Sequence, residues 1–172
     1  MFEVIMNVRF WCWAIMLGVG ATVIVDVWAI ILRRWLGVVP LDFRYVGRWL
    51  GYLPHGILLH KKITQSAPVR GERFLGWGLH YVIGVAFAAM LLAVVGLEWV
   101  VQPTLLPAVL LGIITVVFPY FVLQPCLGAG VASCRTPKPN RARIKSLVTH
   151  LIFGIGLYLT VQLLVFVRVL ID

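Results

Sequence analysis

Four polar residues that could take part in chemistry lie in otherwise apolar stretches of the sequence. They are Asp26, His80, Gln124 and His150. The three ionisable ones lie five to seven residues inside the nearest basic residue, which corresponds to roughly 7–10 Å of helix. An ionisable side chain inside a membrane-spanning helix costs about 2.5–3.5 kcal/mol on insertion scales, so it normally faces the protein interior and has a partner. Histidine changes charge near neutral pH and is a natural partner for a carboxylate in proton transfer. The pattern predicts a polar layer that binds a proton, an ion or a small polar solute.

The same residues allow other kinds of site. His80 and His150 could be the axial ligands of one haem b, or both could join Asp26 in a three-ligand site for a divalent metal. The sequence contains no GxSxG, HExxH or CxxC motif, so the usual serine-hydrolase, zinc-protease and dithiol sites lack their residues. We expect no resident cofactor. The residues leave open whether the protein is an enzyme, and they favour a protein without enzyme activity. A third hypothesis is an accessory or assembly subunit, in which the polar layer only fixes helix register.

The composition defines the elements that must position these residues. Apolar residues make up 62% of the 172 residues, charged residues only 12%, and the mean hydropathy is +1.00. A soluble domain of this length needs more charge to cover its surface. Four stretches are long enough to span a bilayer, at about 10–32, 74–101, 104–124 and 147–170. The sequence therefore predicts an all-α integral membrane protein in which residues 1–172 form one four-helix domain.

Basic residues are concentrated in two loops, 33–73 and 125–146, which hold thirteen of the 15 lysines and arginines and leave Arg9 and Arg168 elsewhere. The positive-inside rule predicts that both loops are cytoplasmic and both termini lie outside. Basic loops beside apolar spans also favour anionic lipid headgroups, and not nucleic acid, as partners. Because four spans are few for a solute carrier, we expect a homodimer.

Two segments of these loops have patterns of their own. Residues Asp42–Leu53 predict a short interfacial helix that Asp42 caps and Pro54 ends. Arg44 and Arg48 share a face other than that of its apolar residues. In the second loop, Gly128, Gly130 and Arg135 could form a backbone nest for a phosphate or a lipid headgroup.

A weak internal repeat relates the two histidine-containing spans. Gly76 and Gly84 flank His80 at a spacing of four residues, and Ser146 and Gly154 flank His150 in the same way. Small residues at these positions would let neighbouring helices approach closely. The repeat suggests two pseudo-repeated hairpins, each with a basic loop between its helices.

Several blocks of the chain, taken together, resemble one family. The blocks are VDVWAIILRR, LDFRYVGRWLG, GWGLHYVIGVAFA, PTLLPAVLLGIIT, QPCLGAGVASCRTPKPN and THLIFGIGLYL, between about Leu17 and Leu159. They resemble the DUF2938 family of uncharacterised bacterial membrane proteins. The resemblance implies a small multi-pass protein of the bacterial inner membrane. It carries no activity and no catalytic residues.

Overall fold

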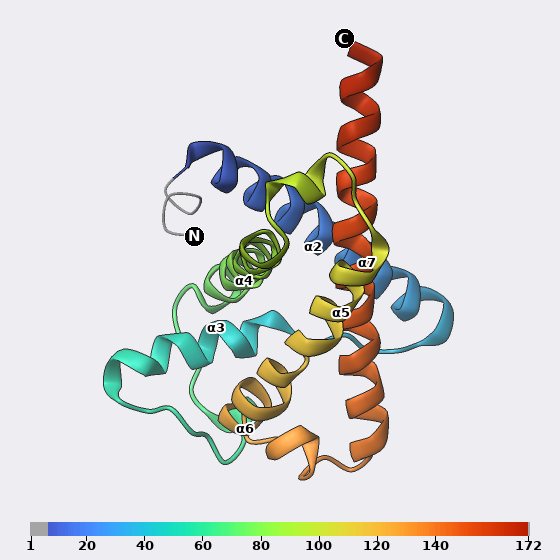
Figure 1. The fold of residues 1–172 in the computed structure, drawn as a ribbon. Coiled ribbons are helices and arrows are strands. Elements are labelled where there is room, and N and C mark those ends of the chain that lie inside the picture. The colour runs from blue at the N-terminus through green and yellow to red at the C-terminus, as the bar shows by residue number, and fades with distance from the viewer. Residues whose placement is uncertain (1–6, 172) are drawn as a thin grey trace. The chain divides into compact units, whose positions relative to one another are not determined.

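The computed structural model describes residues 7–171, with side chains up to Val167, and the described part is helical with no strand (Figure 1). Its α-helices are α2 (Val8–Leu36), α3 (Phe43–Tyr52), α4 (Glu72–Val95), α5 (Leu105–Thr115), α6 (Gln124–Cys126) and α7 (Pro139–Ile171). Short turns connect them: η1 (Leu53–His55), η2 (Ile63–Gln65), η3 (Leu97–Val100) and η5 (Val131–Ser133) are 3-10 turns, and η4 (Pro119–Leu123) is a π-helical turn.

Within the described residues, four helical segments are long and apolar enough to cross a membrane. They are Val8–Leu36, Glu72–Val95, Leu105–Cys126 and Pro139–Val167. Much of their surface is exposed apolar side chain, as expected for helices surrounded by lipid. The predicted fold class, an all-α membrane protein with four transmembrane helices, is confirmed.

The ends of the first two spans differ from the hydropathy ranges. Helix α2 begins earlier, because the Asn7 side chain accepts a hydrogen bond from the amide of Arg9, and it continues to Gly37, whose φ of 63° ends it. Helix α4 ends at Val95 instead of near residue 101, because Gly96 adopts a φ of 81° and the chain then enters η3. Hydropathy alone does not detect a helix end that is set by a glycine with positive φ.

The fourth span begins eight residues before the predicted position 147, at Pro139. Proline is favoured in the first turn of a helix, where its missing amide is not needed. Consequently Arg141, Arg143 and Lys145, which were expected in a loop, lie on α7. The side chain of Arg168, assigned to the outer side in the sequence analysis, lies outside the described residues.

The third span is interrupted near its C-terminal end, as expected for an internal proline. The α-helical pattern of α5 ends at Thr115, and η4 begins at Pro119. The amide of Gln124 donates to the carbonyl of Pro119, five residues back, which is the π-helical pattern. Proline removes one donor from the helical ladder, and the chain compensates with this wider turn.

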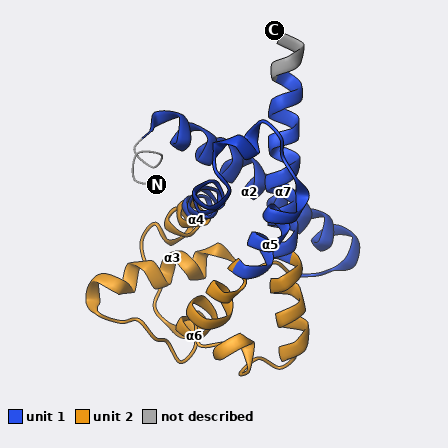
Figure 2. Ribbon diagram, in the orientation of Figure 1, with its two compact units in different colours: residues 1–38, 81–114, 149–172 blue, residues 39–80, 115–148 orange. Residues whose placement is uncertain are grey.

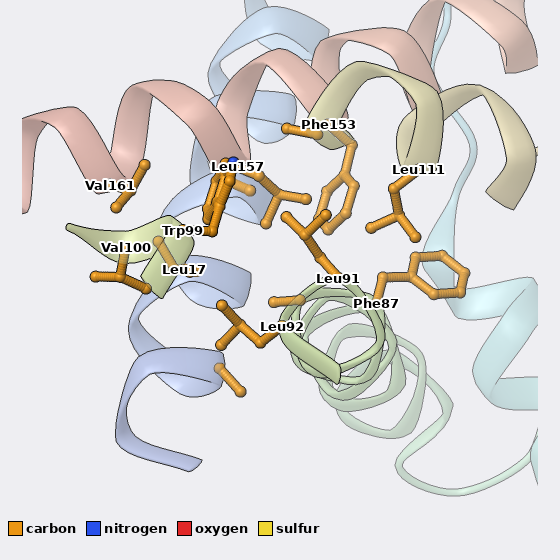
Figure 3. Close-up of a cluster of buried hydrophobic side chains, with 14 of the residues drawn as sticks. Leu17, Phe87, Leu91, Leu92, Trp99, Val100, Leu111, Phe153, Leu157 and Val161 are labelled. Carbon is orange, nitrogen blue, oxygen red and sulfur yellow. The ribbon is translucent and has the colours of Figure 1, made fainter. Parts of the chain in front are cut away.

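The chain divides into two compact units, coloured separately in Figure 2. Unit 1 comprises residues 1–38, 81–114 and 149–172, and unit 2 comprises residues 39–80 and 115–148. Unit 1 has an apolar core to which α2, α4, η3, α5 and α7 all contribute (Figure 3). Leu17, Leu92, Leu157 and Val161 are among its fully buried side chains.

Unit 2 joins the two basic loops into one folded body. The amide of His60 donates to the carbonyl of Cys126 over 3.0 Å, and the amide of Ile63 donates to the carbonyl of Leu127 over 3.1 Å. Gly128 makes this approach possible, because a Cβ on it would overlap the backbone of Lys61. The predicted interfacial helix is present as α3, and Asp42 caps it by accepting from the amide of Arg44 over 3.0 Å.

Candidate functional site

Helices α2 and α4 cross in unit 1 at glycines, and this crossing positions the candidate site. A Cβ on Gly18 would lie 2.5 Å from the Cα of Val85, and a Cβ on Gly84 would overlap the hydroxyl of Thr22. The Thr22 hydroxyl donates instead to the carbonyl of Gly18, over 2.7 Å. Since lipid provides no hydrophobic drive for helix association, close packing of small residues is the usual way to hold such helices together.

Asp26 lies one helical turn beyond Thr22, and Tyr81 lies three residues before Gly84, so the crossing brings them together. The Tyr81 hydroxyl donates to Oδ2 of Asp26 over 2.9 Å. Both side chains are half-buried. The ionised carboxylate accepts from the phenol, and the protonated carboxyl group can still accept from the phenol or donate to it, so the pair can bind a proton without losing its hydrogen bond.

Tyr81 was missed in the sequence analysis, although it directly follows His80 and is a polar side chain inside a predicted span. Trp28, two residues after Asp26, was missed as well. Its Nε1 is buried and has no hydrogen-bond partner among the described residues. Such an indole donor is unusual, because buried tryptophan N–H groups normally find an acceptor.

His150 lies where α5 and α7 cross, also in unit 1. A Cβ on Gly112 would lie 2.5 Å from the His150 carbonyl oxygen, and a Cβ on Gly154 would lie 2.5 Å from the carbonyl oxygen of Ala108. The His150 ring faces that of Phe87, with 6.3 Å between centroids. The prediction that Gly84 and Gly154 allow close helix approach is confirmed, and His150 belongs to the packed interior of unit 1.

His80 and Gln124 belong to unit 2. The His80 ring stacks on the ring of Phe43 in α3, with centroids 4.1 Å apart and an interplanar angle of 27°. Gln124 donates from Nε2 to the hydroxyl of Ser146 over 3.0 Å, while its Oε1 is buried without a hydrogen-bond partner in the described structure. Gly76, which flanks His80, packs against the backbone of Phe43 and Gly47, so it receives the interfacial helix.

Each of the four predicted site residues therefore has a defined local contact within its own unit. Asp26 contacts Tyr81, His80 contacts Phe43, Gln124 contacts Ser146 and His150 contacts Phe87. That the four form one layer, and that Asp26 pairs with a histidine, stay predictions. Across residues 7–171, no group of three or more His, Cys, Asp or Glu residues is arranged to hold a metal ion. The haem and metal hypotheses stay predictions from sequence.

Arg48 makes the contact that anchors α3. The sequence groups it with Arg44 on a face other than the apolar one, and in the structure it is buried, with 6% of its surface exposed. Its Nε and Nη2 donate to the two carboxylate oxygens of Glu72 over 2.8 and 3.0 Å, and Nη1 donates to the carbonyl of Ser66 over 2.8 Å. The hydrogen bonds that Arg48 donates to Glu72 hold the pKa of Arg48 above its usual value. The helix is anchored by this ion pair, which links residues 24 positions apart.

The backbone nest predicted at Gly128, Gly130 and Arg135 stays a prediction, and most amides of this loop already have acceptors. The amides of Gly128, Ala129, Ser133, Cys134, Arg135 and Thr136 all donate to backbone carbonyls within the same segment. An anion would have to break these bonds to use the amides, so the hydrogen bonding does not support a nest built on Gly128 and Gly130. Arg135 itself is exposed.

The comparisons with known proteins identify a family. No curated protein and no solved structure matches the chain. The family described as "Protein of unknown function (DUF2938)" matches residues 15–164, which includes all four candidate spans in large part and both basic loops. The chain, with its four apolar helices and its basic loops, belongs to the DUF2938 family.

Proposed function

We propose that this chain is a multi-pass protein of the bacterial inner membrane that binds a proton and passes it across the membrane. The site is intramembrane and contains Asp26 and Tyr81. An ion or a small polar solute is the wider class of substrate. The observation that carries the proposal is the 2.9 Å hydrogen bond from the Tyr81 hydroxyl to Asp26. It joins two membrane-spanning helices at a glycine crossing. An ionisable residue inside a span is a functional candidate by default, because its insertion is costly.

The depth of Asp26 suits such a site. It is ten residues from the end of α2 at Leu36, or roughly 15 Å along the helix, and eighteen residues from the start. The residue is thus within the apolar span and nearer to its basic end. His150, elsewhere in unit 1, is a second side chain of a type that can carry a proton.

The proposed orientation places both basic loops in the cytoplasm and both termini outside. Unit 2 contains eleven of the 15 basic residues and two of the six acidic ones, so it carries the entire formal charge of +9. A body of this charge is retained on the cytoplasmic side by the positive-inside rule. Impermeant maleimide should label Cys134 in inside-out vesicles and leave it unlabelled in intact spheroplasts. The reverse pattern would overturn the orientation.

Proton passage can be tested with purified protein in liposomes that contain a trapped pH-sensitive dye. A potassium diffusion potential should drive proton uptake into vesicles containing the native protein and not into empty vesicles. Asp26→Asn, which keeps the size and hydrogen-bonding capacity of the side chain, should abolish the uptake. Asp42→Asn is the matched control, because it removes a carboxylate outside the spans. Equal uptake by native and Asp26→Asn vesicles would contradict the proposal and favour a subunit without transport chemistry.

A further inference from the structure

A surface cavity of about 350 Å³ in unit 2 is lined by cations. The residues that surround it are Cys134, Lys138, Pro139, Asn140, Arg141 and Arg143. Three of the six are basic and none is acidic. The volume is sufficient for a phosphate group with its substituents, since small-molecule pockets begin at about 300 Å³.

The local fold brings these cations to one place. Helix α7 begins at Pro139, so Arg141 and Arg143 lie in its first turns, beside the end of the preceding loop. Arg143 is fixed there, because its Nε donates to the carbonyl of Ala132 over 2.8 Å and its Nη1 donates to Oδ1 of Asn140 over 3.2 Å. The Tyr120 hydroxyl donates to the Arg143 carbonyl over 2.6 Å and ties this turn to the third span.

The loop that supports Arg143 is in an unusual conformation. Ala132 and Ser133 have φ values of 46° and 59°, so two successive residues other than glycine occupy the left-handed region. Such backbone persists where the surrounding structure over-determines it, and it is concentrated at binding sites. Here it directs the Ala132 carbonyl to the guanidinium of Arg143.

The acidic residues of unit 2 are engaged elsewhere. Asp42 forms an ion pair with Arg44, and Glu72 forms one with Arg48, so both contact cations that do not line the cavity. The positive potential at Lys138, Arg141 and Arg143 is therefore not offset by a carboxylate in the cavity wall. The first turn of α7 adds to this potential, because helix amino-terminal amides favour anions.

We propose that this cavity binds the phosphate group of a lipid headgroup or of a soluble phosphate ester. Guanidinium groups match phosphate oxygens in pairs and remain charged at any physiological pH, which makes arginine the preferred residue for this anion. The site is separate from the Asp26–Tyr81 pair and involves different residues. It uses side chains, unlike the backbone nest predicted for Gly128 and Gly130.

Cys134 provides a direct reporter, because it lines the cavity and is exposed. The protein, with Cys12→Ala to remove the other exposed thiol, is placed in phosphatidylcholine nanodiscs, and the rate of Cys134 alkylation is measured. One arm adds inorganic phosphate at constant ionic strength set with chloride. The other arm replaces part of the phosphatidylcholine with phosphatidylglycerol. Occupancy of the cavity should slow alkylation severalfold.

Arg141→Gln is the test variant, and Arg70→Gln is the matched control, because Arg70 is an exposed arginine of the same unit that does not line the cavity. Arg141→Gln should weaken protection by roughly tenfold or more in ligand concentration, as expected for loss of a charge-assisted hydrogen bond. Arg70→Gln should keep the native protection.

The arms also identify the source of the phosphate. Protection by phosphatidylglycerol without protection by inorganic phosphate assigns the cavity to a lipid headgroup, and protection by inorganic phosphate assigns it to a soluble ester. Protection in neither arm would overturn the proposal. Equal loss of protection in Arg141→Gln and Arg70→Gln would overturn it too, because the effect would then follow from net charge and not from the cavity.

Discussion

The two compact units of this chain are built by different physical means. Unit 1 has four basic and four acidic residues in its sequence ranges, and an apolar core with glycine crossings holds it together. Unit 2 carries the whole net charge, and a buried ion pair with backbone hydrogen bonds between loops holds it together. A chain that contacts both lipid and water needs both kinds of interaction. Burial of apolar side chains drives folding only where those side chains would otherwise be exposed to water.

The largest loss of stability is expected in unit 2, from a substitution of Arg48. Arg48→Ala leaves the half-buried carboxylate of Glu72 without its cation and also removes a donor from the Ser66 carbonyl. Breaking a buried ion pair in this way costs about 3–5 kcal/mol. Thermal unfolding in detergent, together with limited proteolysis of residues 57–70, should show the loss.

Arg44→Ala is the control for Arg48, because it lies on the same helix and its ion pair with Asp42 is exposed on both sides. Exposed ion pairs contribute little to the free energy of unfolding, so this variant should unfold at the same temperature as the native protein. Equal destabilisation by both variants would show that α3 is sensitive to any loss of charge and that the buried pair has no special role.

The next effect is expected in unit 1, at the glycine crossing. Gly84→Val adds side-chain volume where even a Cβ would overlap Thr22, so α2 and α4 must separate. Overpacking of this kind costs about 1–3 kcal/mol. Unfolding in mixed detergent micelles measures the loss. Gly78→Ala, on the same helix but with no atom within 4 Å of an added Cβ, should be neutral or slightly stabilising.

A smaller effect is expected from the hydrogen bond between Asp26 and Tyr81. Tyr81→Phe should destabilise unit 1 by about 0.6 kcal/mol, which is the average for such bonds between membrane helices. In a double-mutant cycle, Tyr81→Phe should have little effect once Asp26 is changed to Ala. An unchanged effect of Tyr81→Phe in that background would mean that the two side chains do not interact.

The smallest effect concerns the cap of α3. The hydrogen bond from the Arg44 side chain holds the pKa of Asp42 below its usual value. A carboxyl whose folded pKa is lowered stabilises the protein at pH values above its unfolded pKa, and this contribution is lost as the pH falls through the folded pKa. The melting temperature of the native protein should therefore fall slightly more than that of Asp42→Asn on acidification below about pH 4.

The parts of the structure that follow from local sequence were predictable. Hydropathy predicted the four spans, and Asp42 predicted the start of α3. Helix ends at Gly96 and Pro139 were not predicted, because apolar content does not report a positive φ or a proline in a first turn.

Long-range contacts could not be predicted in the same way. The burial of Arg48 could not be predicted, because its partner, Glu72, is far away in sequence. The contact between Asp26 and Tyr81 depends on how two helices are rotated about their axes, which is set by Gly18 and Gly84. The polar types of the site residues could thus be identified from sequence, while their partners required the fold.

The central claim is that Asp26 exchanges a proton inside the membrane, and infrared difference spectroscopy of the protein in lipid tests it most directly. A carboxyl stretching band should appear and disappear reversibly as the pH is changed. The band should shift in Tyr81→Phe, which removes its hydrogen bond, and should be absent in Asp26→Asn. A carboxyl spectrum that is the same in the native protein and in Asp26→Asn at every pH would contradict the account.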